Sequence, residues 1–200
     1  MSESTIACLL VTHLPVKAER QRYPALRGKP LVIVESHGIR ELVLDSSPEA
    51  RGVRAGMTLP EVLARCPGAT LLPADFRFYD NVFDRMAENI AMRCPVVEKA
   101  EMGCVYTWLE ELAPIYGGEA RLIASLLQSV PPDFGLRVGV ASSRFAAYVS
   151  AATAPPGRAV KTQLDSAALL SGHSIDPLIS PQARARLHRS GLTTIKQLAA

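Results

Sequence analysis

The chain has 200 residues, of which 48% are hydrophobic, enough for one substantial core shared by two or three packed subdomains. The net charge is +3 and 17 of the 22 basic residues are arginines, so composition alone supports nucleic-acid binding only weakly. No apolar run approaches the length of about 20 residues that a membrane helix needs, and the N-terminus lacks a signal-peptide pattern. We therefore expect a cytoplasmic protein with no membrane partner.

The N-terminal third of the chain alternates strand and helix patterns. Residues 5–12 form a continuous apolar run, which is typical of a central strand buried on both faces. A short helix follows, and residues 31–35 and 40–44 predict a hairpin that turns at residues 36–38.

Two short helices are predicted after this hairpin. Residues 45–47 are N-cap types followed by Pro48, so the first helix should begin there and end at Gly52. Thr58 and Glu61 have the spacing of a capping box and predict the start of the second helix. Together these helices would form a small lobe.

The rest of the chain predicts a palm-like α+β arrangement. Apolar residues at steps of three and four predict a helix over 75–92, and 98–108 read as a β-turn-β or one extended run. Further predicted elements are a helix from 118 to 130, a strand at 136–142, a helix at 144–154, an edge strand at 159–161 and three short helices after it. The last helix reaches Ala200 without a capping residue, so we expect the chain to be part of a longer protein.

Four segments, in their order and spacing, resemble the Y-family (translesion) DNA polymerases. They are RYPALRGKPLVIV at 22–34, RGVRAGMTLPEVLARCPGATLLPAD at 51–75, FGLRVGVASSRFAAYVSAATAPPG at 134–157 and LHRSGLTTIKQLA at 187–199. The resemblance implies an α+β fold built on a polymerase-like palm, a ferredoxin-like βαββαβ sheet with helices on one face. It places the palm at 1–19 and 75–165, a small fingers lobe at 20–74, and the start of a helix-hairpin-helix thumb at 166–200. The family's little finger would lie beyond this chain.

The resemblance also implies a two-metal active site, but the aligned positions lack its ligands. The family's metal-binding Asp-x-Asp falls on Leu10 and Thr12, and the Asp-Glu of its central palm strand falls on Gly103 and Cys104. Two-metal phosphoryl transfer needs carboxylates around cations about 3.5 to 4 Å apart, and magnesium prefers oxygen ligands. We therefore expect no magnesium site, no cofactor and no catalytic residue.

Positions that hold the incoming nucleotide in the family are changed as well. The aromatic pair that excludes ribonucleotides falls on Leu14 and Pro15, and the palm lysine falls on Tyr148. The fingers tyrosine and arginine fall on Ser46 and Glu49 or, if two residues are deleted, on Pro48 and Arg51. Only Arg51 would keep a family contact.

The catalytically degenerate, ImuB-like branch of the family also lacks the metal ligands. The segment IYGGEARLIASLL at 115–127 resembles the LFGGE run of that branch. This resemblance implies a non-catalytic DNA-repair accessory that binds DNA and proteins in translesion synthesis and damage-induced SOS mutagenesis. The implied partners are primer-template DNA, recognised without sequence preference, a companion error-prone replicative-type polymerase, a RecA-like accessory protein and the sliding clamp.

Other interpretations of single residues stay open. Glu101, predicted on the same strand face as Gly103, and Glu110 could be relocated metal ligands of an active error-prone polymerase; surface solvation is the alternative. His13 could be a residual metal ligand or an ordinary strand-end histidine. Cys104 could be a nucleophile or a packed thiol, and no CxxC pair indicates zinc.

Contacts with DNA are predicted in the thumb-like part and beside the central strand. Basic residues near a helix start favour phosphate, although Leu178 to Ser180 replace the glycines of the family's hairpin. Tyr106 and Trp108 could stack on a base or belong to the core. The DNA-binding candidates of the thumb are Arg184, Arg186, Arg189 and Lys196.

Overall fold

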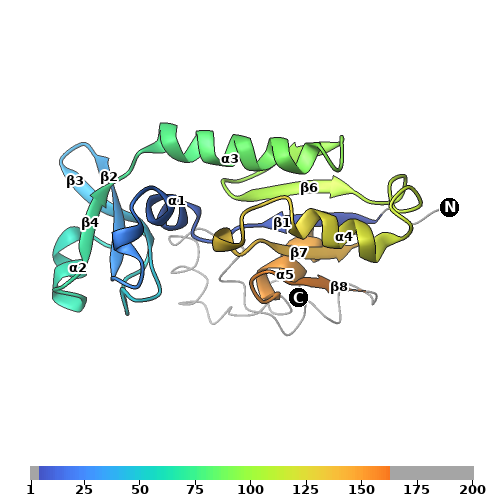
Figure 1. The fold of residues 1–200 in the computed structure, drawn as a ribbon. Helices are drawn as coiled ribbons and strands as arrows, with labels where there is room; N and C mark the ends of the chain where they lie inside the picture. Colours follow the sequence, from blue (N-terminus) through green and yellow to red (C-terminus); the bar gives the residue numbers. More distant parts are fainter. Residues whose placement is uncertain (1–4, 163–200) are drawn as a thin grey trace, which may run out of the picture. The chain divides into compact units, whose positions relative to one another are not determined.

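The computed structural model describes residues 5–162, and these divide into two compact units. Of the described residues, the first unit holds 5–10 and 89–162, and the second holds 11–88. Figure 1 shows a sheet in each unit. The predicted thumb, with Arg184, Arg186, Arg189 and Lys196, lies outside the described residues.

The first unit is built on a five-stranded sheet in the order β5-β6-β1-β7-β8. The central strand β1 (Ile6–Leu10) pairs antiparallel with both β6 (Cys104–Trp108) and β7 (Arg137–Ala141). All five residues of β1 are buried, as the continuous apolar run predicts. The edge strands are β5 (Val97–Lys99), antiparallel to β6, and β8 (Ala159–Lys161), parallel to β7.

Helix α5 (Arg144–Thr153) lies across β1 and β7, and small residues allow the close approach. Ser143 caps the helix by accepting a hydrogen bond from the Ala146 N–H at 3.3 Å. A Cβ at Gly139 of β7 would clash with the backbone of Ala147 and Ala151, so the helix can pack here only over glycine. Helix α4 (Glu119–Leu127) lies beside β7, and the 3₁₀ turn η2 (Pro132–Phe134) leads into that strand.

The second unit is built on a three-stranded sheet in the order β3-β2-β4. The hairpin of β2 (Leu31–His37) and β3 (Arg40–Ser46) is confirmed, although both strands run further than predicted. Helix α1 (Leu14–Arg22), the 3₁₀ turn η1 (Pro24–Leu26) and α2 (Leu59–Arg65) complete the unit, together with the first part of α3 (Phe76–Ala91). The capping box holds: the Thr58 N–H donates to Glu61 Oε2 at 2.8 Å.

One predicted helix is wrong and one strand was missed. Residues 47–52 form consecutive turns instead of a helix, because β3 continues to Ser46 and the Asp45 carboxylate binds elsewhere. Strand β4 (Thr70–Pro73) pairs parallel with β2, which is a non-local contact that four residues ending in proline do not signal.

The other predicted elements of the described chain agree with the structure to within a few residues. The α+β fold class is confirmed, and residues 98–108 are a strand-turn-strand. The predicted boundaries of palm and fingers stay a prediction. Over residues 5–162, the structure contains no helix with the length and apolarity that crossing a membrane requires.

Candidate functional site

Three of the four positions aligned with the family's metal ligands meet at one end of β1. Leu10, the last residue of β1, is the register partner of Cys104, the first residue of β6. Gly103 precedes Cys104 in the turn from β5, which the Ala100 N–H closes by donating to the Cys104 carbonyl at 3.0 Å. Leu10 and Cys104 are 6% and 3% exposed, so both side chains belong to the core. Thr12 is half-buried in the second unit.

The backbone at Gly103 also differs from what a strand-borne ligand needs. Its φ is 84°, in the left-handed region that residues with a Cβ avoid. An aspartate at this position would strain the turn or reshape it. Both the side chain and the local backbone at position 103 therefore depart from the family pattern.

A pair of thiols occupies this end of the sheet. Cys8 Sγ lies 3.7 Å from Cys104 Sγ, within hydrogen-bonding distance for sulfur, on the face that packs against α5. The hydrogen bond with Cys104, together with burial, raises the pKa of Cys8, so this thiol stays protonated at neutral pH. Burial likewise raises the pKa of Tyr106 and of Tyr148, which pack against the same cluster. The group can carry at most one soft sulfur anion.

This donor set does not fit magnesium. Hard divalent cations take oxygen ligands, and paired cations need several carboxylates to balance their charge. Leu10 and Gly103 offer no side-chain donor, and Cys104 offers sulfur. Among residues 5–162, no group of three or more His, Cys, Asp or Glu side chains is placed to hold a metal ion.

The acidic residues considered as relocated metal ligands do not lie together at the end of β1. Glu101 is exposed and lies in the turn between β5 and β6, so its prediction on the strand face of Gly103 is wrong. The Glu110 carboxylate accepts a hydrogen bond from the Thr5 N–H at the start of β1. Glu111, beside it, is exposed and lines a groove described below.

The positions aligned with nucleotide contacts divide between the units. In the second unit, Leu14 is buried at the start of α1, Pro15 follows it, and Glu49 is bound by Arg20, whose Nη2 donates to Glu49 Oε2 at 2.6 Å. Ser46 ends β3, where its hydroxyl donates to a backbone carbonyl. The remaining positions are Tyr148, half-buried on α5 of the first unit, and the alternatives Pro48 and Arg51, both exposed in the second.

His13 is held by a carboxylate that the sequence did not connect to it. His13 stands at the N-cap of α1 with φ 54°, and its Nδ1 lies 2.6 Å from Asp45 Oδ1. Asp45 also accepts hydrogen bonds from the Val16 N–H at 3.3 Å and the Ser46 N–H at 2.8 Å. The Asp45 side chain therefore stabilises the start of α1, instead of capping the helix predicted after it.

Tyr106 and Trp108 are partly buried and share an arginine that the sequence did not indicate. The Arg144 guanidinium lies 5.7 Å from the ring centre of Tyr106 and 5.5 Å from that of Trp108. The same guanidinium forms a two-pronged ion pair with Glu98, at 2.7 and 2.6 Å. The two rings thus belong to the edge of the core, with the outer side of Trp108 facing a groove.

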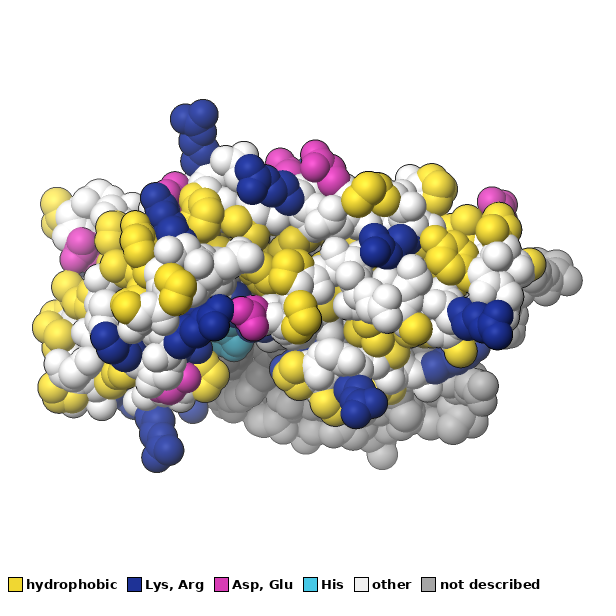
Figure 2. Space-filling model, in the orientation of Figure 1, with side chains coloured by type: hydrophobic (Ala, Val, Ile, Leu, Met, Phe, Trp, Pro, Cys, Tyr) yellow, Lys and Arg dark blue, Asp and Glu magenta, His cyan; other side chains and the backbone are white. Residues whose placement is uncertain are grey.

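Basic side chains are spread over the described surface. Figure 2 shows Lys and Arg side chains scattered among hydrophobic and polar ones on the face in view. This pattern suits contacts with separate phosphates better than one deep anion pocket. The exposed arginines of the second unit include Arg27, Arg40, Arg51, Arg54, Arg65 and Arg77.

Comparisons with known proteins agree on the family. The model of the impB/mucB/samB family matches residues 11–152. DNA polymerase IV of Alkaliphilus oremlandii is 23% identical over 196 residues, covering 92% of this chain and 48% of the relative. DNA polymerase IV of Shewanella sp. W3-18-1 is 30% identical over 137 residues, covering 66% of this chain and 38% of the relative. The chain thus spans less than half the length of these curated relatives.

Solved structures show the same fold at low sequence identity. DinB from Sulfolobus solfataricus superposes with a TM-score of 0.76 at 20% identity, covering 98% of this chain and 60% of that one. A post-insertion binary complex of Dbh DNA polymerase superposes with a TM-score of 0.74 at 21% identity, with the same coverage. The chain therefore belongs to the impB/mucB/samB family and has the fold of the Y-family DNA polymerases.

Proposed function

We propose that this chain is a non-catalytic, polymerase-like DNA-repair protein that binds DNA and proteins as an accessory in translesion synthesis and damage-induced mutagenesis. The observation that carries the proposal is the corner formed by Leu10, Gly103 and Cys104. Two of these side chains have no donor atom, one is a buried thiol, and the backbone at Gly103 is left-handed. Losing the carboxylates together removes the counter-charge that paired cations need.

The fold supports DNA as the ligand. The neighbours with the same fold include binary and ternary complexes of Dbh DNA polymerase. Exposed arginines of the second unit provide phosphate contacts that require no metal and read no sequence. The protein partners follow from the ImuB-like resemblance: an error-prone replicative-type polymerase, a RecA-like protein and the sliding clamp.

One observation favours a second function. Curated relatives that match this chain are named DNA polymerase IV, so an active error-prone polymerase with relocated ligands is the alternative. Its ligands would come from Glu101 and Glu110, which frame β6 at its two ends. Five strand residues separate these ends by about 14 Å, too far for one ion to join both carboxylates without a rearrangement.

Primer extension separates the two functions. The protein is incubated with labelled primer-template and all four deoxynucleotides, with magnesium and then with manganese, beside an active DNA polymerase IV. The accessory role predicts no added nucleotide at enzyme concentrations that saturate the template. Extension by this chain that is lost in Glu101→Ala or Glu110→Ala, and kept in Glu41→Ala, would establish the polymerase and overturn the accessory role. Glu41 is an exposed glutamate of β3 in the second unit.

A further inference from the structure

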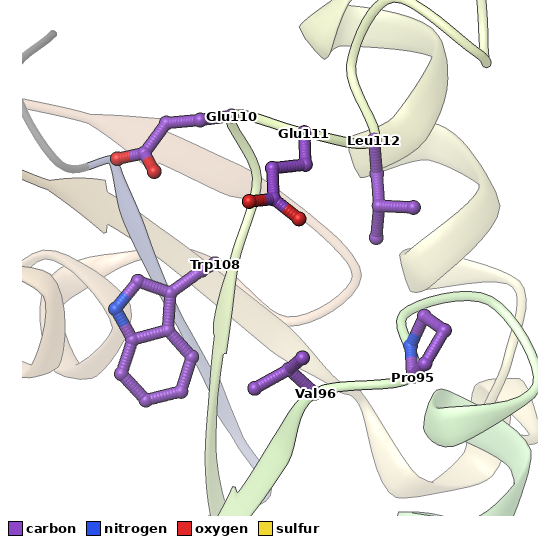
Figure 3. Close-up of a pocket in the computed structure, with 6 residues that line it drawn as sticks. All are labelled: Pro95, Val96, Trp108, Glu110, Glu111 and Leu112. Atoms are coloured by element: carbon purple, nitrogen blue, oxygen red, sulfur yellow. The ribbon is translucent and has the colours of Figure 1, made fainter.

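A groove opens in the first unit at the end of β6 opposite to Cys104. It has a volume of about 390 Å³, and Figure 3 shows its walls. This size is enough for one or two large side chains. The groove is lined by Pro95, Val96, Trp108, Glu110, Glu111 and Leu112.

The floor and walls of the groove are mainly apolar. Trp108 is the last residue of β6. Pro95 and Val96 lie just before β5, and Leu112 lies after β6. Val96 is 63% exposed, a large fraction for a valine beside a tryptophan. The Arg144 guanidinium, which is paired with Glu98, also contacts the Trp108 ring. A concave, mainly apolar surface with a few polar groups at its edge is the usual form of a ligand-binding site.

The rim of the groove is acidic. In Figure 3 the Glu111 carboxylate hangs over the space between Trp108 and Leu112, while the Glu110 carboxylate turns toward β1, where Thr5 binds it. Glu111 is exposed, and within the described part of the chain no cationic side chain pairs with it. A ligand that brings its own positive charge next to apolar groups would complement both features.

Charge also selects the class of ligand. Nucleic acids and membrane surfaces are anionic, so the Glu110 and Glu111 carboxylates disfavour them at this place. A protein segment can present an apolar side chain and a cation side by side, and Lys and Arg stems add apolar contact of their own. We propose that the groove binds a segment of a partner protein in which a large apolar residue is adjacent to Lys or Arg.

This inference goes beyond the proposed function and does not depend on it. The groove lies at the other end of β6 from Leu10, Gly103 and Cys104, so a catalytic chain could carry the same docking surface. The two proposals are tested by different assays. Primer extension tests whether the chain adds nucleotides, and peptide titration tests whether the groove binds its ligand.

Trp108 makes the groove directly measurable, since it is the one tryptophan in the sequence. The 200-residue chain is titrated with a short synthetic peptide that has the core Lys-Leu-Phe-Arg, and Trp108 fluorescence is followed. Control peptides carry Glu-Leu-Phe-Glu or Lys-Ala-Ala-Arg. We expect a saturable change in emission with the first peptide and a response at least tenfold weaker with either control, since charge and apolar contact act together.

Matched variants tie the signal to the groove. Glu111→Gln should weaken binding of the Lys-Leu-Phe-Arg peptide about threefold, the effect of one exposed ion pair. Val96→Ser should weaken it by a similar factor through lost apolar area, and its exposure makes the substitution harmless to folding. Glu41→Gln, which removes the same charge from the second unit, should leave the affinity unchanged.

Three results would overturn the proposal. One is no saturable change with the Lys-Leu-Phe-Arg peptide in a chain whose circular dichroism shows it to be folded. The second is equal binding of the Glu-Leu-Phe-Glu peptide, which would make the contact apolar only. The third is a small aromatic amine that displaces the peptide completely and binds as tightly as the peptide does, which would assign the groove to a small molecule.

Discussion

Gly139 shows how one residue determines the packing of the first unit. A Cβ there would lie closer to the backbone of Ala147 and Ala151 than real Cβ atoms come to other atoms, so α5 would have to move off β7. We predict that Gly139→Ala lowers the free energy of unfolding by at least about 3 kcal/mol. Gly68→Ala is the control, because Gly68 has nothing within 4 Å of the added Cβ. Urea unfolding that gives equal stability for both variants would contradict this account of the packing.

Part of the candidate site could be predicted from the sequence, and part could not. The alignment with the family places Leu10 and Cys104 at one site, and the register of β1 with β6 pairs these two residues. The contact of His13 with Asp45 was not predictable, because it joins a helix start to a strand end 32 residues away. Asp45 has the pattern of an N-cap, and only the folded chain shows which helix it serves.

At the level of elements, the start of α2 provides a pH-dependent test. Hydrogen bonds from the Thr58 backbone and then its hydroxyl lower the pKa of Glu61 below its ordinary 4.5. A lowered folded-state pKa gives stability that is present above the unfolded-state pKa and lost as pH falls through the folded-state value. We therefore predict that Glu61→Gln is less stable than the parent at pH 7, and that the difference shrinks below pH 4.5.

Urea unfolding at a series of pH values measures this difference. Thr58→Ala removes the hydroxyl donor and keeps the backbone N–H, so it should cost about 1 kcal/mol and leave part of the pH dependence. A stability difference between the parent and Glu61→Gln that stays constant from pH 7 to pH 3 would show that the capping box carries no such charge effect.

The elements that the sequence predicted are those with local signals. Helix α3 has a strong helical period, α2 has its capping box, and β1 is a continuous apolar run. The missed strand β4 depends on its parallel partner β2, which lies more than 30 residues earlier. The helix predicted over residues 45–52 had N-cap residues and a proline but no apolar face to bury, and tertiary contacts of Asp45 and Ser46 prevailed over that local pattern.

At the scale of the whole molecule, the chain keeps the family fold but not the carboxylates that the aligned metal-binding positions carry in the family. The sheet, its register and α5 reproduce a polymerase framework, while the side chains at the end of β1 provide packing instead of anionic oxygens. Fold alone does not determine activity, so binding must be argued from surfaces. For the DNA contact proposed above, the candidate surface is the set of exposed arginines of the second unit.

Binding to DNA should therefore depend on salt and need no magnesium. We predict that the affinity for a fluorescent primer-template falls steeply with sodium chloride, with a log-log slope of about −0.9 for each phosphate contacted. Replacing magnesium with EDTA at constant ionic strength should not weaken binding, because arginine contacts need no bridging ion. Fluorescence anisotropy measures both quantities, for matched duplexes of unrelated sequence.

Arginine variants show which surface makes these contacts. Arg51→Gln and Arg54→Gln, both exposed in the second unit, should each make the salt slope shallower by about one unit. Arg144→Gln removes the same charge from a guanidinium already bound to Glu98, so its slope should match that of the parent. If binding instead requires magnesium, or if the slope is the same in all four proteins, metal-bridged contacts or another surface hold the DNA.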